Sequence, residues 1–179
     1  MLVQAGLFLL DTLAGFVCIL LLLRFYMQAL RVSFRNPLGG FVVQATNWLV
    51  LPLRRVLPGL FGLDLSCLLP AYLLQAVLLL AVVAARGGLA TFDGGALVAL
   101  ILGRAVLATL RLSVYLLIGA LILQAVLSWV NPYAPIAQPL AQFTRPFLDP
   151  IRRFVPPIAS IDVSPLIAIV LAQLALIFL

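Results

Sequence analysis

The stretch PLRRVLPGLFGLDLS at residues 52–66 decides the fold, because it returns as PIRRFVPPIASIDVS at residues 150–164. The two stretches align without a gap at a spacing of 98 residues. Six positions are identical, and five more exchange one aliphatic residue for another. Such an ordered recurrence is typical of an internal repeat, which has to be recognised before local structure is assigned.

The composition excludes a soluble protein. Of the 179 residues, 65% are hydrophobic and 9% are charged, whereas soluble domains are about 45–50% apolar and about 25% charged. The formal net charge is +6, and all 11 basic residues are arginines at the ends of apolar runs or near them. This placement favours anionic lipid headgroups over nucleic acid as the basic residues' partner.

Four apolar runs predict the membrane spans, at residues 3–23, 67–85, 96–130 and 165–179. The first is close to the ~20 residues that cross the hydrocarbon core. The third would be ~52 Å long as a helix, which exceeds a core of ~30 Å. We therefore expect residues 112–130 to cross, with the preceding part in the interface or outside the membrane.

These runs predict an all-α integral membrane protein with four transmembrane spans. Residues 1–86 and 96–179 form two parallel helical hairpin repeats, and a Gly-rich loop at residues 87–95 connects them. The segments between spans one and two and between spans three and four hold eight of the eleven arginines. By the positive-inside rule these segments are cytoplasmic and both termini lie outside.

Each cytoplasmic segment carries an apolar stretch with polar breaks, at residues 41–51 and 140–148, which predicts an element lying on the inner leaflet. Paired arginines follow it. Adjacent helical residues point about 100° apart, so one arginine of each pair can face phosphates while the other turns inward. Lipid or partner contact is therefore predicted for Arg54, Arg55, Arg152 and Arg153.

An Asp-x-Ser sequence precedes the second span of each half. Serine is a favoured N-cap and proline a favoured first helical residue, while aspartate suits the positive end of the helix dipole or pairs with a nearby arginine. The repeated stretch is thus predicted to dock on the leaflet, turn on prolines and cap the next helix. The re-entry and capping residues are Pro52, Pro58, Asp64, Ser66, Pro150, Pro156, Asp162, Ser164 and Pro165. The alternative is that the two Asp–Arg sites form one symmetric binding surface.

Polar residues in or beside the spans have two interpretations. Four glutamines favour hydrogen bonds between helices, and the alternative is a polar pathway through the membrane. These residues are Gln28, Gln75, Gln124 and Gln173. Asp11 is the one acidic residue inside a predicted span and is a further candidate for proton or cation handling.

The two long segments around the repeated stretch, residues 35–66 and 131–165, resemble the YggT family, called YlmG in cyanobacteria and chloroplasts. The family's element is Pro-x-x-Arg-x-x-x-Pro followed by Asp-x-Ser-Pro ahead of a span. Cys67 stands where the first copy would have its last proline. The resemblance implies the two-repeat proteobacterial form in the inner membrane. It also implies links to osmotic tolerance and ion uptake, to division components and to assembly of photosynthetic complexes.

The sequence offers no chemistry for an enzyme. Histidine is absent, no Gly-rich phosphate loop follows a strand, and Cys18 and Cys67 are isolated thiols in or beside apolar runs. We predict no catalytic, cofactor-binding or metal-binding residue. The predicted function is a non-enzymatic scaffold or assembly factor, with a membrane-protein partner or a second copy of the chain. The alternative is a small transport or channel component in osmotic or ion homeostasis.

Overall fold

The computed structural model describes residues 1–55, 64–88, 93–154 and 162–179, and within them it contains six α-helices and no strand. The helices are α1 (Leu2–Ala29), α2 (Pro37–Arg54), α3 (Leu65–Ala85), α4 (Gly94–Val130), α5 (Ala137–Phe154) and α6 (Ser164–Phe178). Three of them, α1, α3 and α4, are long and apolar enough to cross a membrane. The apolar helix α6 is shorter, with 15 residues. The protein is therefore an all-helical, membrane-embedded chain.

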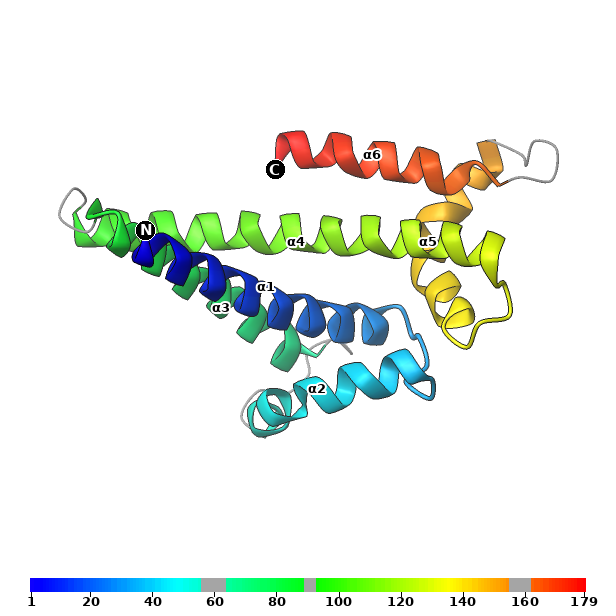
Figure 1. Ribbon diagram of the computed structural model, residues 1–179, viewed down its shortest axis with the longest axis horizontal. Coiled ribbons are helices and arrows are strands. Elements are labelled where there is room, and N and C mark those ends of the chain that lie inside the picture. The colour runs from blue at the N-terminus through cyan, green and yellow to red at the C-terminus, as the bar shows by residue number, and fades with distance from the viewer. Residues whose placement is uncertain (56–63, 89–92, 155–161) are drawn as a thin grey trace.

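The two halves of the chain use the same order of helices. In the first half α1 packs against α3, and α2 contacts both; in the second half α4 packs against α6, and α5 contacts both. Contacts of α4 with α1 and α3 join the halves. Figure 1 shows the N-terminus, the end of α3 and the start of α4 at the left, and the α1–α2 and α4–α5 connections at the right.

The helix boundaries differ from the predicted spans, most clearly at α1 and α4. Helix α1 continues to Ala29, beyond the apolar run that ends at Leu23, because Arg24 finds polar partners on α2 and does not end the helix. Helix α4 is one continuous helix of 37 residues, about 55 Å long. It also begins at Gly94, inside the predicted connecting loop.

The turn between α1 and α2 is tight and depends on two residues. Asn36 caps α2, because its Oδ1 accepts a hydrogen bond from the Gly39 amide at 2.8 Å, and Pro37 follows as the first helical residue. A Cβ atom at Gly39 would lie 2.6 Å from the Cα of Phe34. Only glycine therefore lets the start of α2 approach the preceding turn this closely.

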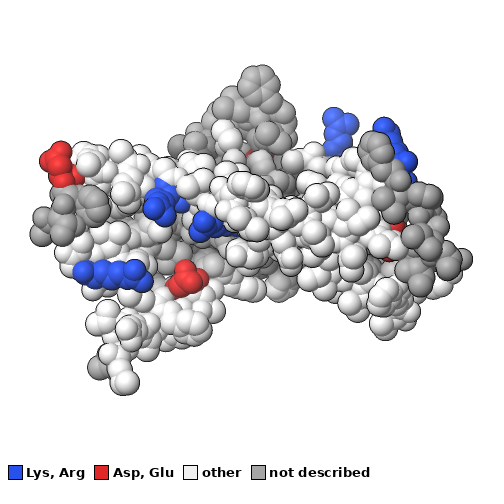
Figure 2. Space-filling view, turned by 90° about the horizontal axis from the view of Figure 1, so that it is seen from above, with Lys and Arg blue, Asp and Glu red and all other residues white. Residues whose placement is uncertain are grey.

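Apolar clusters hold the helices together. One joins α1, α2 and α3 around Cys18, Leu22, Val50 and Cys67, all fully buried. Many other large apolar side chains are exposed, as expected for a surface that faces lipid. Figure 2 shows the charged side chains as isolated groups on a surface that is otherwise uncharged.

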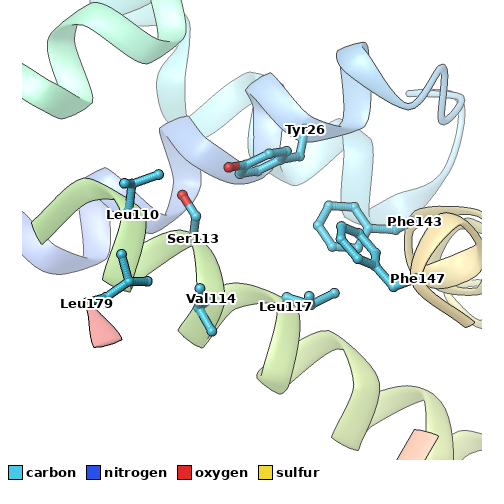
Figure 3. Close-up of a pocket in the computed structure, with 8 residues that line it drawn as sticks. All are labelled: Tyr26, Leu110, Ser113, Val114, Leu117, Phe143, Phe147 and Leu179. Atoms are coloured by element: carbon cyan, nitrogen blue, oxygen red, sulfur yellow. The ribbon is translucent and has the colours of Figure 1, made fainter. Parts of the chain in front are cut away.

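The seam between the two halves is largely apolar. The rings of Tyr26 on α1 and Phe143 on α5 meet edge to face, with centroids 6.3 Å apart. A cavity of about 190 Å³ lies beside them, and Figure 3 shows side chains of α1, α4 and α5 around it. Burial of such aromatic surface holds the two halves against each other.

Candidate functional site: two arginine–aspartate clamps

The first copy of the repeated stretch forms an ion pair that we call the first clamp, Arg54 with Asp64. Arg54 is the last residue of α2, and its Nε and Nη2 both donate to Oδ2 of Asp64, with an Nε–Oδ2 distance of 2.8 Å. Asp64 is the N-cap of α3, and its Oδ1 accepts a hydrogen bond from the Ser66 amide at 3.1 Å. One carboxylate thus ties the end of α2 to the start of α3.

The second copy forms the second clamp, Arg152 with Asp162. Arg152 donates from Nε at 3.0 Å and from Nη2 at 2.6 Å to Oδ2 of Asp162. Oδ1 of Asp162 accepts from the Ser164 amide at 3.0 Å. The same atoms therefore make the same contacts 98 residues apart, which gives the repeated stretch a physical reason: it fastens α5 to α6 as it fastens α2 to α3.

Both clamp carboxyls are held in the ionised form. Burial alone would raise the pKa of Asp64, but hydrogen bonds and charge from Arg54 and the Ser66 amide outweigh it, so the pKa lies below its ordinary value. The pKa of Asp162 is lowered in the same way: burial opposes ionisation, and Ser164 and Arg152 outweigh it. Ionised aspartate at a helix start also suits the helix dipole.

The predicted capping residues need correction. Ser66 and Ser164 are not N-caps; they lie within the first turn of α3 and α6, and both are buried. Asp64 takes the cap of α3, because its carboxylate reaches the amide two residues on while also accepting from arginine. In α6 the N-cap is Val163, so Ser164 is the first helical residue and Pro165 the second, one position later in the helix than predicted.

The predicted turns at proline also need correction. Pro52 lies inside α2 and Pro150 inside α5. Pro52 lacks the N–H that would donate to the Trp48 carbonyl, and the helix continues for two residues beyond it despite this loss. Pro58 and Pro156 lie outside the described residues.

A sequence model of the family described as CCB3/YggT matches residues 3–85 and 103–179, one segment in each half of the chain. The chain belongs to this family.

Similar proteins occur in several bacteria. A Pseudomonas aeruginosa protein is 36% identical over 172 residues, which cover 95% of this chain and 85% of that protein. Escherichia coli K12 YggT is 36% identical over 168 residues, covering 92% of this chain and 83% of its own. A Vibrio alginolyticus protein is 34% identical over 170 residues, covering 94% and 89%. No solved structure matches the chain significantly, and the names of these relatives state no activity.

Arg24 is a polar centre that the sequence analysis missed. It lies on α1 with 4% of its surface exposed. Its Nη1 lies 2.7 Å from Oγ1 of Thr46, 3.1 Å from Oδ1 of Asn47 and 3.4 Å from the Val43 carbonyl oxygen, all on α2. The arginine was used only as a marker of orientation. Apolar residues continue directly after Arg24, at Phe25, Tyr26 and Met27, and this continuation was the signal that Arg24 faces protein.

The second half has a different, neutral contact at the place that corresponds to Arg24. At the 96-residue spacing that aligns Gln28 with Gln124, the position of Arg24 is occupied by Ala120. Thr144, which corresponds to Thr46, instead forms a close hydrogen bond with Gln124. The side-chain hydrogen bonds that join α1 to α2 therefore come from a charged group, whereas the one that joins α4 to α5 is between neutral groups.

The structure places the four glutamines in different surroundings. Gln75 is buried on α3, within hydrogen-bonding reach of Cys18 on α1, and Gln124 bonds Thr144 as described. Gln28 is half-buried, and Gln173 is exposed on α6. Asp11 is exposed on α1. The glutamines are not gathered at one place in the protein.

The two clamps differ in exposure although their contacts match. The Asp64 side chain is 6% exposed and the Asp162 side chain 38% exposed. A cavity of about 250 Å³ opens beside the second clamp, where α4, α5 and the start of α6 meet. Its lining includes Gln124, Ser128, Trp129, Arg152, Asp162 and Pro165.

Proposed function

We propose that the protein is a non-enzymatic scaffold or assembly factor of the bacterial inner membrane. Its four apolar helices cross the membrane as two parallel hairpins, with both termini on the periplasmic side and α2 and α5 at the cytoplasmic leaflet. The observation that carries the proposal is that the two adjacent arginines of each pair have different contacts. Arg54 and Arg152 each hold the aspartate of a clamp although they are partly exposed, while the exposed Arg55 and Arg153 form no salt bridge with a described residue.

Helix α2 has the form of an element that lies in a leaflet. Its inward face buries Val42, Thr46 and Val50. Its outward face exposes Phe41 and Trp48, at 54% and 68%. An apolar outward face with an interfacial tryptophan suits insertion between headgroups and acyl chains, and the exposed Arg55 at its end suits lipid phosphate.

Helix α5 presents a different outward face. Leu140, Phe143 and Leu148 are buried, and the exposed positions include the polar residues Gln142 and Arg145. A polar, charged face at the leaflet suits contact with water or with a polar surface of another protein more than insertion into lipid. We therefore assign partner contact chiefly to α5 and leaflet docking chiefly to α2.

A conduit for ions or solutes is the weaker alternative. A shared pathway would bring the polar side chains of corresponding helices to one lumen. Gln75 is instead buried inside the first hairpin, and Gln173 lies exposed on the outside of the second. This arrangement favours helix-to-helix hydrogen bonding for Gln75.

Cross-linking in native membranes tests the scaffold role. A photoreactive residue at Phe147, an exposed position of α5, is expected to capture one defined membrane protein or a second copy, whereas one at Phe41 on α2 captures lipid. Arg153→Gln, which leaves the second clamp intact, should reduce the protein adduct, and Arg55→Gln is the matched control. Lipid alone at both positions, together with ion flux through reconstituted protein, would contradict the proposal.

The orientation has a separate test. A cysteine at Gln142, placed in a variant without Cys18 and Cys67, should react with an impermeant thiol reagent in inside-out vesicles and resist it in intact spheroplasts. The reverse pattern would place α5 on the periplasmic side and overturn the assignment of the leaflet.

A further inference from the structure

The second clamp borders a cavity, and its aspartate is more exposed than that of the first clamp. In the first half the aspartate is covered and its side chain is 6% exposed. In the second half Asp162 and Arg152 are 38% and 43% exposed, and both line a space of about 250 Å³. The side chains of Arg54 and Arg152 are about equally exposed, at 44% and 43%, so the two ion pairs differ in the aspartate, which is buried in one half and accessible in the other.

The lining of this cavity offers both signs of charge and neutral hydrogen-bonding groups. Asp162 supplies a carboxylate, Gln124 an amide, Ser128 a hydroxyl and Trp129 an indole face. Arg152 uses two N–H groups, on Nε and Nη2, to hold Asp162. A guanidinium has five such donors, so further donors serve a ligand without breaking the clamp.

The balance of charges selects the class of ligand. An anion alone would meet the carboxylate of Asp162, and a cation alone would meet the guanidinium of Arg152. A zwitterion satisfies both, with its cationic group at the carboxylate and indole face and its anionic group at the guanidinium. The Ser128 hydroxyl lines the same cavity as the carboxylate and can accept a further hydrogen bond. These acceptors favour a primary ammonium, which donates three hydrogen bonds, over a quaternary one, which donates none.

We propose that this cavity binds the headgroup of phosphatidylethanolamine, with the ammonium at Asp162 and Trp129 and the phosphate at Arg152. The site lies where α4 ends and α6 begins, and Trp129 is 77% exposed there, as suits a residue at headgroup depth. A volume of about 250 Å³ is at or below the small end of ligand pockets, so it suits a headgroup while the acyl chains remain in the bilayer.

Native mass spectrometry of the detergent-solubilised full chain tests the proposal. Phosphatidylethanolamine, phosphatidylglycerol and phosphatidylcholine are added separately, and the bound fraction of each is measured. We expect at least about tenfold tighter binding of phosphatidylethanolamine than of the other two, a difference of about 1.4 kcal/mol. Equal binding of the three lipids would overturn the proposal.

Two variants localise the site. Asp162→Asn removes the charge that meets the ammonium, and Ser128→Phe fills the cavity without touching the clamp; each is expected to lower phosphatidylethanolamine binding at least about tenfold. Arg145→Gln, on the exposed face of α5, is the control and should leave binding unchanged. Unchanged binding in both cavity variants would overturn the assignment, as would equally strong binding of soluble phosphoethanolamine, which would indicate a soluble ligand.

This assay is independent of the scaffold proposal. Binding in micelles does not require that α5 face the cytoplasm or that a protein partner exist. Loss of lipid selectivity would therefore leave the cross-linking result standing, and a failed cross-linking experiment would leave the lipid site standing.

Discussion

The two halves of the chain make the same clamp and surround it differently. In the first half the clamp aspartate is buried, and Arg24 joins α1 to α2 beneath the surface. In the second half Ala120 stands at the position of Arg24, and the clamp aspartate borders a cavity. The comparison teaches that the repeated stretch fixes how one helix follows another, while the side chains around it decide whether the ion pair is structural or accessible.

Helices α2 and α5 also differ between the two halves. Helix α2 exposes Phe41 and Trp48, which suit a leaflet, whereas α5 exposes Gln142 and Arg145, which suit water or a polar partner. The first half thus has the properties of an anchor. In the proposed function the second half is the surface that binds other molecules.

The largest expected effect comes from Arg24→Met, which keeps the length of the side chain and removes its charge and donors. Three acceptors on α2 would lose their partner, and hydrogen bonds to charged groups are worth about 1.5–3 kcal/mol. We expect a loss of about 3 kcal/mol in the free energy of unfolding, measured in micelles. Arg35→Met, at an exposed position of the next turn, is the control and should change stability little. Equal effects would mean that the buried charge does not hold α2.

The second-largest effect is expected at acidic pH, which should weaken the clamps. The folded-state pKa of Asp64 and of Asp162 is lowered, so their stabilisation is complete above the ordinary aspartate pKa of about 3.9 and is lost as pH falls through the lower folded value. We expect a constant unfolding midpoint from about pH 7 to 5 and a decline below about pH 4. Asp64→Asn should flatten that decline more than Asp162→Asn, because the first clamp is buried. An identical acid profile in both variants would contradict the difference in burial.

A smaller effect is expected at the glutamines. Gln75→Leu removes a buried polar contact between α1 and α3, and such contacts in membranes average about 0.6 kcal/mol. Gln173→Leu, at an exposed position of α6, should leave the thermal midpoint unchanged. If Gln173→Leu were the more damaging of the two, α6 would have a partner helix that this fold does not contain.

The smallest effect is expected for Arg145→Ala. Arg145 donates to Asp149 one helical turn on at 3.1 Å, and its side chain is 74% exposed. Exposed pairs of this spacing contribute about 0.3–0.5 kcal/mol, so the thermal midpoint should shift only slightly. A large destabilisation would show that this face of α5 is covered in the folded protein.

Much of the fold could be predicted from the sequence, because apolar run lengths and the repeated stretch are strong signals. The order of an apolar helix, a more polar helix and a second apolar helix in each half follows from the runs between residues 3 and 179, as does the membrane-embedded class. The pairing of each aspartate with an arginine of its own stretch was among the alternatives, and the structure shows it in both halves.

The predictions that the structure contradicts, and the contacts that were not predicted, have physical reasons. Serine was preferred as the cap from residue preference alone, but a carboxylate that also binds arginine competes better for the helix start. Pro52 and Pro150 were taken as turns, yet both lie inside helices that continue past them although each proline removes one hydrogen bond to the carbonyl four residues earlier. The partners of Arg24 depend on how α2 packs against α1, which no spacing along the chain reveals.

The most direct measurement compares Asp64→Asn with Asp162→Asn by thermal unfolding at neutral pH in the same detergent. Asparagine keeps the oxygen that accepts the helix-start amide and replaces the oxygen that accepts from arginine by an NH2 group, which is a donor. We predict that Asp64→Asn costs about 2 kcal/mol, because the buried Oδ2 that accepts from Nε and Nη2 of Arg54 is lost. We predict that Asp162→Asn costs about 1 kcal/mol or less, because solvent screens that more exposed pair. Equal losses, or a larger loss at Asp162, would contradict the division into a structural clamp and an accessible one.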